Sequence, residues 1–399
     1  MGGLRPGAGA LDGHRPGARG DAGAGESEGG GRPCPPTAGG CAGRLSAPPA
    51  RCARTPVRLP GITFPENEQK PSTGNIKPAG HGDLATPAAT LHAVKVGITL
   101  PLAEYPGKQP SYDETRALAR QAEAAGFDSL WCFDHLLFRE DGEPAEGIWE
   151  CWTTLSALAE ATSRIQLGTL VLCTAFRNPA VLAKMAVTLD SISNGRLILG
   201  LGAGWHRPEF EAFGIDFDHR VARFEEAVHI IASLLRTGKA EFDGRHSWVH
   251  GGELRPRGVR PAGPPLLIGG SGPRMLRATA RHADLWNGCW FGDPAGFAPA
   301  LHAVREACTA AGRDPSTLRV TAGVNVVPGV PASPPDPRRP VLSGTPADLA
   351  AGFAGYRDLG ADHLVCNLNP HHAAAQRALA EALRRYRSEP DPTEEGPVR

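Results

Sequence analysis

Asp134 and His135 form a pair that could exchange a proton with a bound molecule. They follow residues 129–133, a short apolar run that predicts a buried strand. A histidine titrates near neutral pH, and a pocket around it shifts its pKa in either direction. The structural alternative is a histidine that ends a strand and binds backbone groups. Both residues are catalytic candidates, although Asp134 is better suited to orienting its loop or binding a ligand than to acting as the acid.

A second segment, GGSGP at 269–273, predicts an anion site. Glycines let the backbone approach a phosphate closely, and Pro273 suits the first turn of a helix. The free N–H groups and the dipole of a helix N-terminus favour negative charge. A tight turn into a helix, without a ligand, is the structural alternative. The residues expected to hold a phosphate are Gly269, Gly270, Ser271 and Gly272.

A third segment, GLGAG at 200–204, differs from the fingerprint of a dinucleotide-binding fold. That fingerprint needs GxGxxG after the first strand of its unit and an acidic residue at the end of the next strand. Here the glycines follow the fourth predicted strand, with a different spacing. We expect Gly202 and Gly204 to form a floor of small residues beneath a flat ring, with Trp205 and His206 at the pocket wall.

Strands and helices alternate from residue 94 onward and would position these segments. Apolar runs predict strands at 94–99, 129–133, 165–172, 197–201, 265–268, 283–287, 319–326 and 363–367. Helical spacing appears at 112–125, 152–162 and 220–236, and another helix should begin at Pro179 and end at Gly195. The alternation predicts an α/β fold, a (β/α)8 TIM barrel over 94–388. Residues 241–248 predict a small hairpin inserted before strand five.

Active sites in such barrels lie at the carboxyl ends of the strands. The segments at these ends are 134–135, 173–174, 202–206, 269–273, 286–290 and 367–369. Away from them, we expect Asp190 to form a structural ion pair with Arg196, and His371 and His372 to lie in a solvated loop.

The composition argues against several classes of protein. Lys and Arg number 42 and Asp and Glu number 42, with no long basic run, so neither nucleic acid nor a membrane surface is an expected partner. No apolar run reaches the roughly 18 residues of a membrane span. The cysteines form no CxxC pair, and no metal is expected. We expect a cytoplasmic protein with buried free thiols at Cys132, Cys173, Cys289 and Cys366.

Residues 1–93 differ from the rest of the chain. They are rich in Gly, Pro, Ala and Arg and have too few apolar clusters to offset their chain entropy, which predicts a disordered tail. Residues 389–399 predict a second disordered tail. The first tail has no hydrophobic segment of a secretory signal. Because bacteria can start translation at a GTG codon, we expect Val94 to be the true start.

Several ordered segments between Val94 and Val365 together resemble the bacterial luciferase-like monooxygenase superfamily. The resemblance is to its branch of coenzyme F420-dependent oxidoreductases. The segments are VKVGI at 94–98, WCFDH at 131–135, LGTLVL at 167–172, the stretch 178–210, IGGSGP at 268–273, ADLWN at 283–287, GTP at 344–346 and DHLV at 362–365.

This resemblance implies a homodimer that holds F420 across the barrel mouth and presents a small-molecule substrate to it. In those enzymes the histidine that matches His135 lies beside the deazaflavin and gives or takes a proton during hydride transfer. They also have a bulge behind the ring, which implies a cis peptide bond between Leu170 and Val171. The implied cofactor-binding residues are Leu170, Val171, Cys173, Gly202, Gly204, Trp205 and the four residues at 269–272.

Two alternatives stay open. One is an FMN-dependent monooxygenase that uses oxygen and receives reduced flavin from a separate reductase. The other is a non-catalytic cofactor-binding barrel, against which the glycine segment and the Asp134–His135 pair argue. The Arg-, Ala- and Gly-rich composition is typical of GC-rich actinobacterial genomes, and F420 is common in such bacteria, which favours F420 over FMN.

Trp205 bears on the substrate. In the sugar-phosphate dehydrogenases of the superfamily, a glutamate follows the glycines at this position, so the departure argues against oxidation of glucose 6-phosphate. Together with Trp286 and Trp290, Trp205 points to an apolar or aromatic ligand.

Overall fold

The computed structural model of the chain describes residues 93–104, 108–139, 144–331 and 339–388. All of them belong to one compact unit, Ala88–Arg399. The predicted disordered tails fall, except for residue 93, outside the described residues. Both the tails and the start at Val94 therefore stay predictions.

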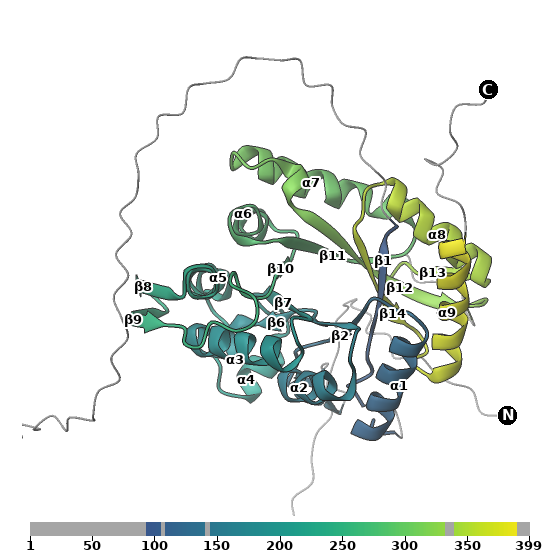
Figure 1. The fold of residues 1–399 in the computed structure, drawn as a ribbon, viewed down its shortest axis with the longest axis horizontal. Helices are drawn as coiled ribbons and strands as arrows, with labels where there is room; N and C mark the ends of the chain where they lie inside the picture. The colour runs from purple at the N-terminus through teal and green to yellow at the C-terminus, as the bar shows by residue number, and fades with distance from the viewer. Residues whose placement is uncertain (1–92, 105–107, 140–143, 332–338, 389–399) are drawn as a thin grey trace, which may run out of the picture. The chain divides into compact units, whose positions relative to one another are not determined.

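Eight parallel strands close into a barrel (Figure 1), which confirms the predicted fold class. Around the barrel each strand pairs with the next, and pairings of β7 with β10 and of β1 with β14 complete the circuit. The strands are β1 (Lys95–Thr99), β2 (Ser129–Cys132), β5 (Gln166–Thr169), β7 (Leu197–Gly202), β10 (Leu266–Gly269), β11 (Leu285–Phe291), β12 (Arg319–Pro328) and β14 (His363–Leu368).

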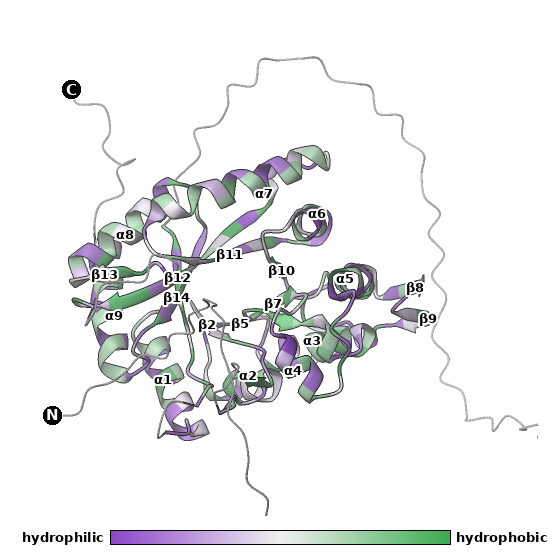
Figure 2. Cartoon of the chain, turned by 180° about the vertical axis from the view of Figure 1, so that it is seen from behind, coloured by the Kyte–Doolittle hydropathy of each residue, from purple (hydrophilic) through white to green (hydrophobic). Residues whose placement is uncertain are grey.

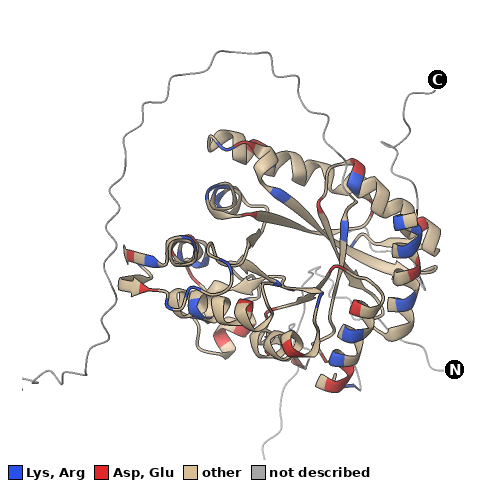
Figure 3. Ribbon diagram, viewed as in Figure 1, with Lys and Arg blue, Asp and Glu red and all other residues tan. Residues whose placement is uncertain are grey.

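A long helix follows each barrel strand and covers the outside of the barrel (Figure 1). These helices are α1 (Tyr112–Ala124), α2 (Cys151–Ala161), α3 (Pro179–Ile192), α5 (Arg220–Thr237), α6 (Pro273–His282), α7 (Ala298–Ala310), α8 (Pro346–Asp358) and α9 (Ala373–Ser388). Hydrophobic colour follows strands such as β12 and β14 (Figure 2), and charged residues gather mainly on the helices (Figure 3). In the described part of the chain, no helix combines the length and the apolarity that a membrane span needs.

Helix α3 begins and ends where the sequence predicts. The Asn178 side chain accepts hydrogen bonds from the backbone N–H groups of Ala180 and Val181, at 3.0 and 3.1 Å, and Pro179 occupies the first turn. The helix ends before Gly195, whose φ of 81° lies in the left-handed region that glycine adopts easily. These local signals place β7 directly after α3.

An antiparallel hairpin, β8 (Lys239–Asp243) with β9 (Trp248–Glu253), is inserted between α5 and β10, as predicted. The carboxylate of Glu226 holds its turn by accepting the backbone N–H groups of residues 245–247. The predicted strand at 165–172 is divided into β5 and β6 (Leu172–Cys173). The sequence did not predict four short elements: β3 (Leu137–Phe138), β4 (Glu146–Gly147), β13 (Leu342–Gly344) and α4 (Arg207–Ala212).

A buried polar chain lies inside the barrel. Trp131 Nε1 donates to Ser129 Oγ at 2.7 Å, and Ser129 Oγ lies 2.7 Å from His363 Nε2. Burial lowers the pKa of His363 to about 3, so its ring is neutral at physiological pH. Apolar side chains, including Ile198, Leu267 and Val365, pack around Trp131. The barrel interior is therefore a filled core beneath the site, as is usual in this fold.

Three expectations about ion pairing or solvent exposure were wrong. Asp190 does not pair with Arg196; it accepts from Nε of Arg260 at 2.8 Å, while Arg196 donates to backbone carbonyls. His371 is not a solvated loop residue, because its Nε2 lies 3.1 Å from Thr99 Oγ1 and burial lowers its pKa to about 4. Cys289 is exposed, whereas the other three strand cysteines are buried.

Candidate active site

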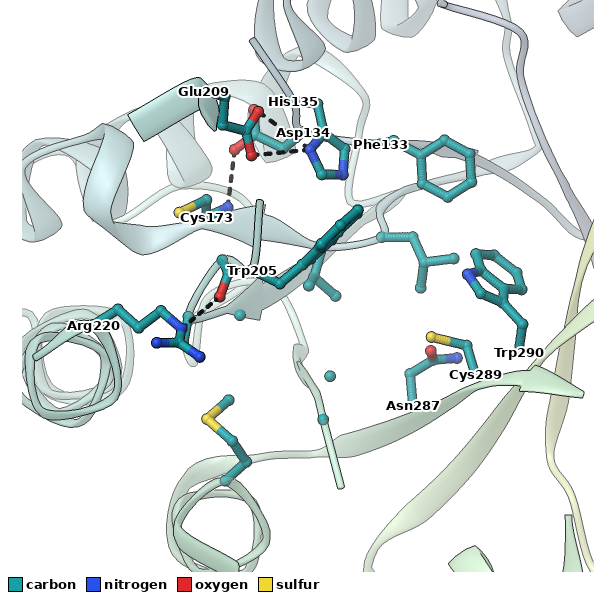
Figure 4. A pocket seen from close by; sticks show the side chains of 18 of the residues that line it. Phe133, Asp134, His135, Cys173, Trp205, Glu209, Arg220, Asn287, Cys289 and Trp290 are labelled. Atoms are coloured by element: carbon teal, nitrogen blue, oxygen red, sulfur yellow. Dashed lines mark hydrogen bonds and ion pairs between the residues drawn. The ribbon is translucent and has the colours of Figure 1, made fainter. Parts of the chain in front are cut away.

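A cavity of about 470 Å³ opens at the carboxyl ends of the strands (Figure 4). Its volume is within the usual range for small-molecule and cofactor sites. Of the predicted catalytic and cofactor-binding residues, all except Ser271 and Gly272 line it. His206 and Trp286 were also expected in the pocket wall, but both are buried and neither lines the cavity. The predicted lining residues are Asp134, His135, Leu170, Val171, Cys173, Gly202, Gly204, Trp205, Gly269 and Gly270; other lining residues are Phe133, Phe138, Ala203, Glu209, Arg220, Val221, Met275, Asn287, Cys289, Trp290 and Asn367.

The carboxylate of Asp134 is occupied by protein groups. Arg177 donates to both of its oxygens, at 2.7 and 2.9 Å, and the backbone N–H of Cys173 donates at 2.9 Å. Arg177 also pairs with Glu150, which caps the start of α2. Burial raises the pKa of Asp134, and the ion pair with Arg177 opposes that rise. This arrangement ties the end of β2 to β6 and to Arg177, which lies just before α3, and thereby fixes the position of the next residue, His135.

His135 is held by a carboxylate that the sequence did not predict. Its Nδ1 lies 3.0 Å from Oε1 of Glu209, on the short helix α4, and the Glu209 carboxylate also accepts the backbone N–H of Leu136 at 2.8 Å. Since a carboxylate only accepts, Nδ1 carries the hydrogen. Nε2 is left without a hydrogen-bond partner among the described residues, and His135 lines the cavity. The ring can therefore offer Nε2 to a bound molecule (Figure 4).

The side chain of Val171 packs against Gly202 and Gly269. A Cβ atom placed on Gly202 would lie 2.5 Å from a Val171 methyl, and one on Gly269 would lie 3.1 Å from the other methyl. The peptide bond between Leu170 and Val171 is cis, which confirms that prediction. The glycines thus make room for the Val171 side chain, and Val171 presents the surface to the cavity. This refines the expected glycine floor, because a flat ring would rest on Val171 rather than on bare glycines.

The start of α6 is open to an anion. Its N-cap is Gly272, no side chain caps its backbone N–H groups, and its first turn contains no acidic residue. Gly270 precedes it with a φ of 133°, a backbone conformation that other residues adopt with strain. The free N–H groups and the helix dipole suit a phosphate.

Arg220 adds a cation to the cavity. Its Nε donates to the carbonyl of Gly204 at 3.1 Å, and its guanidinium lies over the ring of Phe217. Both terminal nitrogens have no hydrogen-bond partner among the described residues. Arg220 lines the same cavity as Gly270, which precedes α6, and Met275, which lies in the first turn of α6. The cation and the α6 N-terminus therefore fit one phosphate-bearing ligand.

Asn287 presents an unsatisfied acceptor. Thr321 Oγ1 donates to the carbonyl of Trp286 at 3.0 Å, so the same hydroxyl accepts from Nδ2 of Asn287, at 2.7 Å. This pairing fixes the amide orientation. Oδ1 of Asn287 has no partner within the described ranges, although the residue is 1% exposed and lines the cavity. An N–H or O–H group of a bound molecule would satisfy it.

A flavin or deazaflavin cofactor combines a flat polar ring with a phosphate, so a site for it needs a surface for the ring and a partner for the phosphate. The cavity offers a smooth apolar surface at Val171, an acceptor at Asn287, and a cation and a helix N-terminus for the phosphate. The residues present therefore fit this class of cofactor. Among the described residues, no group of His, Cys, Asp or Glu is arranged to hold a metal ion.

Glu209 and Arg220 are the charged site residues that sequence analysis missed, and Phe138 is an aromatic one. Glu209 lies 74 positions from His135 on a helix too short to show periodicity, and Arg220 was assigned only to the start of a helix. The one available signal was the charged residues just after the glycines of β7, a strand end that the fold marks as functional. Asn287, Trp290 and Asn367 lie in the strand-end segments that the sequence singled out.

Comparison with known proteins identifies relatives of the barrel. A sequence model of the luciferase-like monooxygenase family matches residues 94–333. Phthiodiolone/phenolphthiodiolone dimycocerosates ketoreductase of Mycobacterium bovis is 34% identical over 233 residues, which cover 54% of this chain and 61% of that protein. Pyrimidine monooxygenase RutA of Cronobacter turicensis is 30% identical over 254 residues, which cover 59% of this chain and 65% of RutA. The chain thus spans less than two thirds of the length of these relatives.

Solved structures share the fold. An F420-dependent secondary alcohol dehydrogenase in complex with an F420–acetone adduct superposes with a TM-score of 0.62 at 19% identity, over 74% of this chain and 100% of that one. The monooxygenase RslO1 from Streptomyces bottropensis gives a TM-score of 0.60 at 22% identity, over 74% of this chain and 100% of that one. At these identities the likeness shows a common barrel and nothing more.

Proposed function

This chain belongs to the luciferase-like monooxygenase family, and from that premise we propose that it is an F420-dependent oxidoreductase that exchanges a hydride with a small organic substrate. The observation that carries the proposal is the pairing of His135 with Glu209 beside the cavity. Interconversion of a carbonyl and an alcohol moves one proton with each hydride, and such a pair supplies an acid–base group for that proton.

Each part of the cavity has a task in this proposal. Arg220 and the α6 N-terminus would hold the cofactor phosphate, Val171 would support one face of the ring, and Asn287 would accept a hydrogen bond from a polar group. When bound, the cofactor supplies or accepts the hydride. His135 gives or takes the proton at Nε2, and Glu209 stabilises the charged imidazole by holding Nδ1–H.

Asp134 is a positioning residue in this scheme. Its oxygens are engaged by Arg177 and the Cys173 backbone, so it fixes the end of β2 instead of exchanging a proton. This is the role that its residue type and place in the sequence favoured over direct catalysis.

The second candidate is an FMN-dependent monooxygenase, which the similarity to pyrimidine monooxygenase RutA favours. An anaerobic assay separates the two. The proposal expects ketones to oxidise reduced F420, or alcohols to reduce oxidised F420, without oxygen. Turnover only with reduced FMN, with consumption of oxygen, would establish the second candidate instead.

We also propose that the chain forms a homodimer. Light scattering of the purified protein tests this: a molar mass near twice that of one chain supports it, and a mass near that of one chain overturns it.

A further inference from the structure

One side of the cavity is built from aromatic rings. The ring centroids of Phe133 and Trp290 lie 5.8 Å apart, and His135 lies 4.5 Å from Phe138 and 5.5 Å from Trp205. All five side chains line the cavity. We call the space bordered by Phe133, Phe138, Trp205 and Trp290 the aromatic compartment. It faces His135, so a molecule that fills it lies beside the proton-exchanging group.

The charged side chains of the cavity are satisfied or lie elsewhere. Asp134 is paired with Arg177, and Glu209 is bound to His135 and the backbone N–H of Leu136. Arg220 lies on the opposite side of Trp205 from Phe133 and Trp290 (Figure 4). The polar groups left for a ligand near the compartment are neutral, and Oδ1 of Asn287 is one of them.

The distribution of charged groups in the cavity determines whether the aromatic compartment favours a neutral or a charged ligand. A carboxylate or phosphate moved from water into the aromatic compartment would lose its hydration and find no uncompensated cation there, because the carboxylate of Glu209 already neutralises the His135 ring when that ring is protonated. A neutral apolar body would instead gain from contact with the rings. The phosphate-binding side does not compensate, because its cation lies across the cavity.

We propose that the aromatic compartment is the substrate subsite and that it takes a neutral aromatic or apolar molecule while rejecting anionic analogues. This inference rests on the proposed function, since it assumes that the other side of the cavity holds the cofactor. It also accounts for the exposed indole of Trp205: the side chain is 63% exposed and would be covered by a ligand on either side.

Cys289 gives the compartment a reporter that does not depend on turnover. Its sulfur lies beside Trp290 in the cavity wall (Figure 4). Among the described residues it is the only exposed cysteine. Its rate of alkylation by N-ethylmaleimide, followed by mass spectrometry of the peptide, reports whether a ligand fills the compartment. Site-resolved peptides separate it from Cys34, Cys41 and Cys52.

The probes are acetophenone and phenylglyoxylate, which share a phenyl ketone and differ in a methyl or a carboxylate group. The full chain is tested with and without saturating F420. We expect acetophenone to protect Cys289 at a concentration about 10-fold or more below that of phenylglyoxylate, because the carboxylate is desolvated without a partner. Equal protection by both, or stronger protection by phenylglyoxylate, would overturn the proposal.

A charge substitution provides the second test. Phe138→Lys places a cation in the compartment and should reverse the order, so that phenylglyoxylate protects better than acetophenone. Phe138→Leu is the matched control and should keep the original order. If Phe138→Lys leaves the order unchanged, residue 138 does not border the site of these ligands and the subsite is wrong.

The test of the aromatic compartment and the test of the proposed function can fail independently of each other. Selective protection by acetophenone with no turnover by F420 would support the subsite and remove the F420 assignment. Turnover with F420 restricted to anionic substrates would keep the assignment and overturn the neutral subsite.

Discussion

Nδ1 of His135 lies 3.0 Å from Oε1 of Glu209. Glu209 belongs to α4 and is only 1% exposed. A buried carboxylate next to an imidazole both selects the tautomer and compensates the charge when the ring is protonated. Glu209 therefore makes His135 an acid–base group whose Nδ1 carries a hydrogen and whose Nε2 is free to exchange a proton with a bound molecule.

Glu209→Gln should lower turnover by roughly 10²–10⁴-fold while leaving cofactor affinity unchanged. The amide can donate to Nδ1, which favours the wrong tautomer, and it cannot compensate an imidazolium. His135→Ala should cost a similar factor, and the double variant should be no worse than His135→Ala alone. Additive losses in the double variant would show that the two residues do not act as a pair.

Gly272→Val should weaken cofactor binding without destabilising the free protein. A Cβ atom on Gly272 meets no atom within 4 Å, and its φ is −68°, so the protein tolerates a side chain that would block the α6 N-terminus. Gly270→Val should also lose binding, with an added cost from its φ of 133° and from Met275, whose Cβ would lie 3.2 Å away.

Thermal melts with and without cofactor measure both effects in these glycine variants. The parent protein should gain stability from the ligand, and the variants should not. A gain in Gly272→Val equal to that of the parent would place the phosphate elsewhere.

Arg220→Gln should reduce cofactor affinity by about 10- to 100-fold, since a charge-assisted bond to the phosphate is worth roughly 1.5–3 kcal/mol. Arg223→Gln, on the same helix, is the control: Arg223 pairs with Asp216 and does not line the cavity. Calorimetric titration gives both dissociation constants. Equal losses in the two variants would indicate a nonspecific effect of charge.

His363 should make the barrel sensitive to acid. Burial lowers its pKa to about 3 in the folded protein, against about 6.5 in an unfolded chain. Between these values the unfolded state binds a proton that the folded state does not, so stability falls as the pH decreases from about 6.5. The contribution is about 1.4 kcal/mol per pH unit.

His363→Gln removes this titration. Urea unfolding at pH 7, 6 and 5 should show a shallower dependence of the unfolding free energy on pH in the variant, whatever its stability at pH 7. His371 titrates in both proteins and cancels in the comparison. Parallel pH dependences would mean that folding leaves the pKa of His363 unchanged, which would contradict its burial as a neutral ring.

The sequence predicted the barrel well because strands buried on both faces appear as apolar runs, such as LILGLG of β7. Capping signals such as Asn178 and Pro179 are local and were equally visible. The side chains that pair with Asp190 and His135 could not be predicted from the sequence. Arg260 is 70 positions from Asp190 in an irregular connection, and Glu209 is 74 positions from His135. Such pairs depend on how the barrel closes, which no local pattern encodes.

The cavity lining was predicted for a related reason. Residues at the carboxyl ends of barrel strands meet because the fold brings them together, so Cys173, Gly202 and Gly270 could be placed from their strands alone. Val171 was expected at the site only from the family resemblance. The packing of the Val171 side chain against the glycines could not be predicted, since it depends on the course of the backbone around β5 and β6.

The most direct test of F420 dependence is a fluorescence titration of the purified chain with oxidised F420 and, separately, with FMN. The account predicts saturable binding of F420 with a dissociation constant about 10-fold or more below that for FMN, a difference of about 1.4 kcal/mol or more. Gly272→Val should lose the F420 signal. Saturable binding of FMN, with no binding of F420, would contradict the account and assign the cavity to a flavin enzyme.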